Sequence, residues 1–96
     1  MNVIDRVILI KSAQKDLVKA PIHILKKFRK WVGDVEKYGL EEVRKVRGWR
    51  DHTLEGDRKG QRAISLNDQW RAIYVIADDG RLYVKVIEVN PHEYKK

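Results

Sequence analysis

Hydrophobic and polar positions follow two different periods along this chain, and the change falls near Gly48. Before that point, most apolar residues recur at steps of three and four, which is typical of amphipathic helices. After it, apolar and polar residues tend to alternate in short runs, which is typical of strands. The pattern therefore predicts a mainly helical first half and a sheet in the second half.

The N-terminal residues predict a strand followed by a helix. Residues 3–10, "VIDRVILI", are β-branched and apolar and suit a first strand. Ser12 is expected to cap the next helix, which would run to about Lys19.

A longer second helix is expected between Pro21 and Gly39. Proline suits the first turn of a helix, and glycine after Tyr38 is a plausible stop. The predicted buried stripe consists of Ile22, Leu25, Phe28, Val32 and Val35. Residues 40–46, "LEEVRKV", can form one or two further turns.

Three strands are predicted in the second half, at residues 61–66, 70–77 and 81–89. Short polar turns at 67–69 and 78–80 separate them, which predicts an antiparallel meander. The expected fold class is α+β, with two N-terminal helices packed on one face of a small, mainly antiparallel sheet, in the order strand, helix, helix, strand, strand, strand. The other face or the edge of the sheet is left free for function.

Size and composition narrow the class of protein. A chain of 96 residues makes one domain, 1–96. It has no cysteine, which leaves no disulfide or thiolate chemistry. No apolar run approaches the ~18 residues of a spanning helix. Asp5 and Arg6 interrupt the first ten residues, so no signal peptide or membrane association is expected, and the expected location is cytoplasmic.

A basic charge balance favours an acidic partner. The net charge is +7, from 21 Lys and Arg against 14 Asp and Glu. Nucleic acid is the simplest such partner, although many small domains are basic only for solubility. Between Arg44 and Arg62, inclusive, there are seven Lys or Arg and three acids, which could contact several phosphates or could form a solvated face.

Candidate chemistry lies on the meander and at the C-terminus. Arg71 begins a strand among apolar neighbours, where it could clamp a phosphate or pair with Asp68 or Glu88. His92 could carry a proton to or from a ribose oxygen, or lie in a solvated tail. Tyr94 could stack on a base or cap the core. The three histidines are far apart and lack metal-ligand spacing, so no metal and no cofactor are expected.

Two stretches of the second half, "LEGDRKGQRAISLNDQWRAIYVI" and "VKVIEVNPHEYKK", resemble the RelE/HigB-type toxins of bacterial toxin–antitoxin pairs. The segments "VILIKSAQKDLVKAP" and "GLEEVRKVRGWRDHTLEG" also fit that family. The Leu-x-Gly-x-x-x-Gly turn, the Asn-Asp-x-x-Arg strand and the terminal His-acid-Tyr are together fairly specific.

This resemblance implies metal-independent cleavage of mRNA, often on the ribosome, in which a ribose 2′-OH attacks the adjacent phosphate. It assigns Arg71 to the scissile phosphate, His52 to general base catalysis, and His92 and Tyr94 to proton transfer and base stacking. Arg62 matches an arginine common in the family's motif. The residues expected to bind RNA are Arg50, Arg58, Lys59, Arg62 and Lys95.

The same resemblance implies a cognate antitoxin, with mRNA and the ribosome as further partners and operator DNA reached only through the antitoxin. Three positions depart from relatives: Ser65 replaces a common arginine, and Pro91 and Glu55 replace lysines. Two alternatives to an active ribonuclease remain, and the three departures bear on the first. One is an attenuated toxin that only binds its antitoxin. The other is a ParE-like gyrase poison, although that branch usually lacks the C-terminal His and Tyr.

Overall fold

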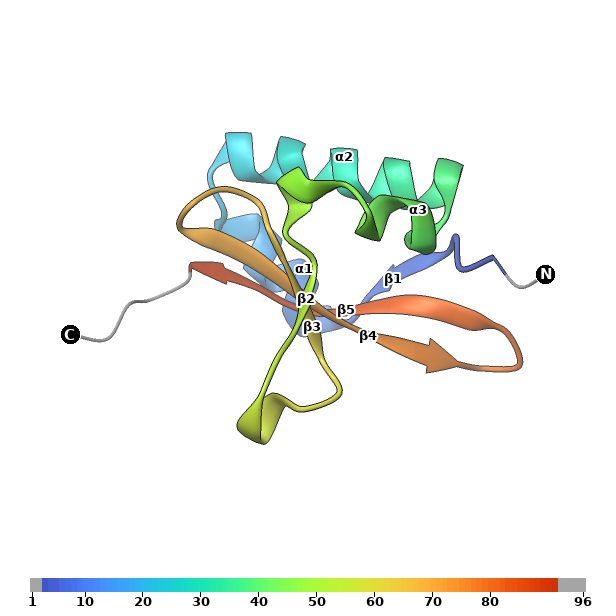
Figure 1. The fold of residues 1–96 in the computed structure, drawn as a ribbon. Coiled ribbons are helices and arrows are strands. Elements are labelled where there is room, and N and C mark those ends of the chain that lie inside the picture. Colours follow the sequence, from blue (N-terminus) through green and yellow to red (C-terminus); the bar gives the residue numbers. More distant parts are fainter. Residues whose placement is uncertain (1–2, 92–96) are drawn as a thin grey trace.

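The computed structural model describes residues 3–91 and places their helices before most of their strands (Figure 1). The elements in chain order are β1 (Val7–Leu9), α1 (Lys11–Lys19), α2 (Ile22–Tyr38), α3 (Leu40–Arg44), the 3-10 turn η1 (Arg47–Trp49), β2 (His52–Thr53), the 3-10 turn η2 (Gly56–Arg58), β3 (Arg62–Ser65), β4 (Trp70–Asp78) and β5 (Leu82–Pro91). No helix within residues 3–91 is long and apolar enough to cross a membrane.

The strands form a five-stranded sheet in the order β1-β5-β4-β3-β2. β1 runs parallel to β5, and the pairs β2–β3, β3–β4 and β4–β5 are antiparallel. This confirms the predicted α+β fold and the meander. β2, a two-residue strand, was not predicted, because so short a segment shows no alternation.

A single hydrophobic cluster joins the helices to one face of the sheet. Its buried members are Ala13, Ile24, Phe28, Trp31, Val35, Leu40, Val43, Trp49, Ile64, Leu66, Ala72, Tyr74, Val84, Val86 and Val89. Trp31 of α2 lies at its centre, with its ring 5.5 Å from that of Tyr74 and 6.0 Å from that of Phe28. Burying side chains of this size contributes about 1.5–3 kcal/mol each. α2 and α3 lie over this face in Figure 1.

The buried stripe of α2 differs from the predicted one. Its buried residues are Ile24, Phe28, Trp31 and Val35, whereas Ile22 is 66% exposed. At 100° per residue, Ile22 lies roughly 150° around the helix from the centre of the observed stripe. The expected stripe was therefore wrong at Ile22, and burial of the larger Trp31 side chain sets the orientation of the helix.

Polar side chains of α1 bind the backbone of β5, and the helix does not begin with a serine cap. The helix starts at Lys11, and its N-cap residue, Ile10, makes no side-chain cap. Ser12 instead donates its hydroxyl to the Ile87 carbonyl (3.4 Å). The Val89 N–H donates to the Asp16 carboxylate (3.0 Å). The predicted cap was wrong, because these polar side chains satisfy backbone groups of β5 beyond the reach of β1.

Candidate functional site

The sheet face opposite the helices carries two of the predicted site residues, His52 on β2 and Arg71 on β4. Directly paired residues of neighbouring strands point to the same face. Two rows of side chains therefore cross this face: His52, Ala63, Ile73 and Glu88 in one, and Ser65, Arg71 and Asn90 in the other.

A β-bulge in β5 makes this arrangement possible. Ile73 pairs with Glu88 while the next residue of β4, Tyr74, pairs with Val86, so Ile87 is the extra residue. Val86 and Val89 are three positions apart and could not share a face under strict alternation. The bulge lets both valines pack under the helices and directs Glu88 toward the open face.

A pocket of about 220 Å³ lies on the open face around the β3–β4 turn. Its lining residues are Arg50, His52, Ser65, Asn67, Asp68, Trp70 and Arg71. Three predicted site residues, Arg50, His52 and Arg71, are thus brought together from two segments about 20 positions apart. The Asn67 side chain shapes the turn, because its oxygen accepts the N–H groups of Gln69 (2.8 Å) and Trp70 (2.7 Å).

Arg71 presents a guanidinium group that has no counter-ion among residues 3–91. The expected alternative was a pair with Asp68 or Glu88. Glu88 instead accepts hydrogen bonds from Arg58 (2.6 Å) and Asn90 (2.6 Å). Within residues 3–91, Arg71 forms no ion pair, and its buried Nε has no hydrogen-bond partner. Such a group is suited to bind an anion that enters the pocket.

His52 is exposed at the pocket, and one of its ring nitrogens forms a hydrogen bond with the backbone. Its Nδ1 lies 2.7 Å from the backbone carbonyl oxygen of Arg50. A carbonyl can only accept a hydrogen bond, so in the neutral ring Nδ1 carries the proton. Nε2 then has a free lone pair and can accept a proton from a bound molecule.

Arg50 contributes both its backbone and its side chain to the site. It adopts the left-handed conformation, with φ of +51°. Its side chain is exposed and also lines a smaller neighbouring hollow of about 150 Å³. Lys27 of α2 lines that hollow as well and lies 5.1 Å from the ring of Trp49. The basic lining therefore continues from the pocket toward α2.

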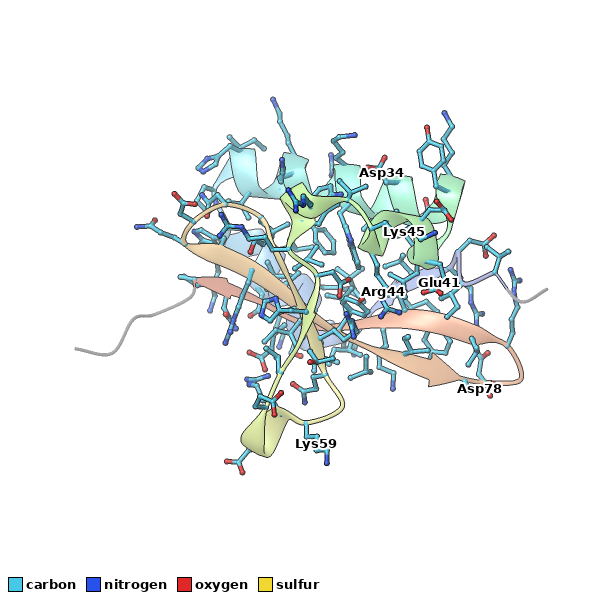
Figure 2. All side chains as sticks on the ribbon, viewed as in Figure 1. Asp34, Glu41, Arg44, Lys45, Lys59 and Asp78 are labelled. Atoms are coloured by element: carbon cyan, nitrogen blue, oxygen red, sulfur yellow. The ribbon has the colours of Figure 1, made fainter. Side chains whose placement is uncertain are left out.

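Arg58 and Lys59 lie at the opposite end of β3 from the pocket (Figure 1). Arg58 is paired with Glu88 and also donates to Gln61 (2.8 Å). Lys59 is exposed on the loop that contains η2 and lies far from the β3–β4 turn (Figure 2). Neither residue lines the pocket.

Arg62 faces the helix side of the sheet. It pairs in register with Tyr74, and its Nε donates to Asp51 at 2.6 Å. The Tyr74 hydroxyl donates to the other oxygen of Asp51. The structure therefore does not bring Arg62 to the pocket, and the predicted contact of this residue with RNA lacks support from its position.

Three predicted residues, His92, Tyr94 and Lys95, lie outside the described part of the chain. The last described residue, Pro91, pairs with Trp70, which lines the pocket. Within residues 3–91, no group of three or more His, Cys, Asp or Glu side chains is placed to hold a metal ion.

Asn67, Asp68 and Trp70 were not predicted to line the site. The Asn-Asp pair was recognised as a turn, and a turn beside an arginine that is predicted to bind phosphate is a signal that could have identified them. Ser65, recognised as a departure from the family pattern, also lines the pocket.

Comparison with known proteins supports the fold. No family model matches the chain, and no curated protein matches it. Among solved structures, it is similar to YafQ from E. coli strain BL21(DE3), with a TM-score of 0.70, 17% identity, and coverage of 88% of this chain and 90% of that one. It is also similar to a chain of the RelBE2 toxin–antitoxin complex from Mycobacterium tuberculosis, with a TM-score of 0.67, 20% identity, and coverage of 96% and 100%. A chain of the E. coli DinJ–YafQ toxin–antitoxin complex gives a TM-score of 0.70 at 20% identity, with coverage of 93% and 94%.

Proposed function

We propose that this chain, which has the fold of the RelE/ParE-like toxins, is the toxin of a type II toxin–antitoxin pair and cleaves messenger RNA. Its activity would arrest translation and growth. The observation that carries the proposal is that one pocket is lined by Arg71, whose guanidinium has no ion pair within residues 3–91, and by His52, whose Nε2 can accept a proton. These are a phosphate-binding group and a base, the two functions that cleavage by a neighbouring hydroxyl requires.

The proposed reaction uses the ribose 2′-OH as nucleophile. His52 Nε2 accepts the 2′-OH proton as the 2′-oxygen bonds to the adjacent phosphorus. Arg71 binds the non-bridging oxygens, where negative charge increases in the transition state. The bond from phosphorus to the 5′-oxygen breaks, and that oxygen takes a proton. The products are a 2′,3′-cyclic phosphate and a 5′-hydroxyl.

We assign the proton for the leaving oxygen to His92 and the orientation of a base to Tyr94, on the family resemblance alone. Both residues lie beyond the described part of the chain. Trp70, at the pocket and paired with Pro91, could offer a second aromatic surface to a base.

RNA and ribosome binding are proposed from charge. The net charge of +7 favours a polyanion, and Arg50 places one positive charge at the pocket itself. Lys59 and Lys95 could contribute to longer-range attraction. The proposed location is the cytoplasm, where ribosomes and transcripts are found.

A cognate antitoxin is the proposed protein partner. The support comes from similar structures that are themselves toxin–antitoxin complexes, RelBE2 and DinJ–YafQ. An acidic partner surface would compensate part of the +7 charge. Contact with operator DNA would then occur only through the antitoxin.

One observation favours a second candidate, an attenuated toxin that mainly binds its antitoxin. Ser65 lines the pocket beside Arg71, where relatives commonly carry a second arginine. A missing phosphate contact typically costs roughly 2–4 kcal/mol of transition-state stabilisation. The attenuated protein would still fold and bind its partner, but it would cleave RNA slowly.

The experiment that tests the proposal adds the purified chain to translating ribosomes and determines the chemistry of the RNA ends. We expect 2′,3′-cyclic phosphate and 5′-hydroxyl ends, and loss of both with Arg71→Ala. Arg81→Ala is the matched control, because Arg81 pairs with Asp5 beyond the far end of β4. Ends with 5′-phosphates would contradict the mechanism. Absence of cleavage by the folded protein would favour the attenuated candidate.

A further inference from the structure

A largely buried charged network lies on the helix side of the sheet, at the end of β3 away from the β3–β4 turn. The side chain of Asp51 is 1% exposed. One of its oxygens accepts a hydrogen bond from Arg62 Nε at 2.6 Å, and the other accepts one from the Tyr74 hydroxyl. Because Arg62 belongs to β3 and Tyr74 to β4, two neighbouring strands fix the position of this carboxylate.

Asp51 lies in the chain between His52, the proposed base, and Arg50, the residue that His52 contacts. It follows Arg50, whose carbonyl accepts the hydrogen bond from His52, and it precedes His52 itself. Arg50 has a φ of +51°, a conformation that residues with a Cβ rarely adopt. A backbone in this conformation persists when surrounding contacts determine it, and the anchored Asp51 side chain is the adjacent contact.

We propose that Asp51, Arg62 and Tyr74 are positioning residues that hold the Arg50 carbonyl where it selects the Nδ1–H form of His52. His52 Nε2 is then left free at the pocket. The proposal rests on the proposed function for the role of His52 as base. It also gives Arg62 a role beneath the sheet in place of the RNA contact expected from sequence.

The protonation states of the network suit this role. Burial raises the pKa of Tyr74, and the hydrogen bond to Asp51 raises it further, so its hydroxyl remains a donor. Burial lowers the pKa of Arg62, but its hydrogen bond and charge interaction with Asp51 outweigh that effect and raise it. The carboxylate therefore keeps both donors at neutral pH.

The first test reads the tautomer of His52 and requires no catalytic activity. Long-range proton–nitrogen NMR correlations of the imidazole, recorded where the ring is neutral, report which nitrogen carries the proton. Tyr74→Phe removes one hydroxyl and retains the ring that packs on Trp31. The matched control is Tyr83→Phe. Tyr83 belongs to β5, its ring lies under the guanidinium of Arg6, and the substitution removes only its hydroxyl.

We expect the wild type and Tyr83→Phe to show the Nδ1–H form, and Tyr74→Phe to show a clear loss of it. An unchanged tautomer in folded Tyr74→Phe would overturn the proposal, as would a wild type in the Nε2–H form. The tautomer can be measured whether or not the chain cleaves RNA. Failure of this proposal can therefore be distinguished from failure of the proposed function.

The second test separates positioning from RNA contact by kinetics. With Tyr74→Phe and Arg62→Lys, we expect kcat to fall about 10- to 100-fold while KM for RNA stays the same. Arg50→Ala, which removes a charge at the pocket, should instead raise KM. If Arg62→Lys raises KM and leaves kcat unchanged, Arg62 contacts RNA and the proposal is wrong. Should Arg62→Lys not fold, Tyr74→Phe decides alone.

Discussion

Three arginines of the sheet region, Arg58, Arg62 and Arg71, differ in what their guanidinium groups contact. Arg58 is paired with Glu88, and Arg62 is paired with Asp51. Arg71 forms no ion pair within residues 3–91 and lines the pocket. A guanidinium that is already neutralised gains less from a phosphate than one that is not. At the scale of single residues, pairing therefore separates structural arginines from the candidate catalytic one.

His52 should be necessary for cleavage, because we propose its Nε2 as the base that accepts the 2′-OH proton at the pocket. We expect His52→Gln to lower kcat by about 10²- to 10⁴-fold without a loss of helical signal. His23→Gln is the matched control, since His23 is exposed on α2. Equal activity of the two variants would show that His52 is not the base.

The sequence predicted Arg71 and His52 as site residues, because the resemblance placed them in recognisable motifs, and both line the pocket. The sequence could not show that Arg62 lies on the other face of the sheet from these two residues. Adjacent strand residues such as Arg62 and Ala63 point to opposite faces, and only the register with β4 shows which face carries the pocket. The Asp51 partner of Arg62 also lies 11 positions away in an irregular segment, which no periodicity reveals.

At the scale of elements, the strands were predicted more accurately than the helix faces. The β3–β4 and β4–β5 turns fall where their Asn, Asp and Gly residues indicated them. The stripe of α2 was wrong at Ile22, because an apolar helix offers more than one orientation and tertiary packing selects among them. The bulge at Ile87 could not be predicted from the sequence either, because a bulge is defined by the register between two strands.

The glycines that bracket the second half of α2 should respond to alanine in opposite ways. Gly33 is exposed within the helix, and a Cβ there would meet no atom within 4 Å. We expect Gly33→Ala to stabilise the fold by about 0.5–1 kcal/mol. Gly39 has φ of +87°, and its Cβ would lie 3.0 Å from Val3. Gly39→Ala should destabilise by about 1–2 kcal/mol. Urea denaturation of both variants checks the signs.

The network across β3 and β4 predicts a stability change at alkaline pH. The ordinary pKa of tyrosine is 10.0, and burial with the Asp51 hydrogen bond raises that of Tyr74. The folded state keeps this proton longer than the unfolded state does. The stability that Tyr74 contributes is therefore complete below pH 10.0 and is lost as pH rises above it.

Wild type should accordingly lose free energy of unfolding faster than Tyr74→Phe above about pH 10, by at most about 1.4 kcal/mol per pH unit. Denaturant titrations of both proteins at about pH 9 and about pH 11 measure the difference. Parallel losses in the two proteins would mean that Tyr74 titrates as it does in the unfolded chain.

At the scale of the whole molecule, the order of elements and their α+β packing followed from the sequence, and the similar solved structures confirm the fold. The parallel pairing of β1 with β5 joins segments near the two ends of the described chain. Such long-range pairing leaves no local signal, so the position of β1 at the sheet edge could not be predicted.

Removal of the residues after Pro91 should abolish activity and leave folding intact. Residues 3–91 form all five strands of the described sheet and its hydrophobic cluster, so a chain that ends at Pro91 should still unfold cooperatively. We expect this truncation to abolish cleavage, because it removes His92 and Tyr94. Thermal melting and the ribosome assay test the two halves of this prediction. Full activity of the truncated chain would exclude both residues from the mechanism.

The most direct measurement of the central claim is induction of the chain in a bacterium, with primer extension on abundant transcripts. Arg71→Ala is induced in parallel to equal levels. We expect growth arrest and new 5′ ends within translated codons for the wild type, and neither for Arg71→Ala. Growth arrest without new ends, or equal cleavage by folded Arg71→Ala, would contradict it.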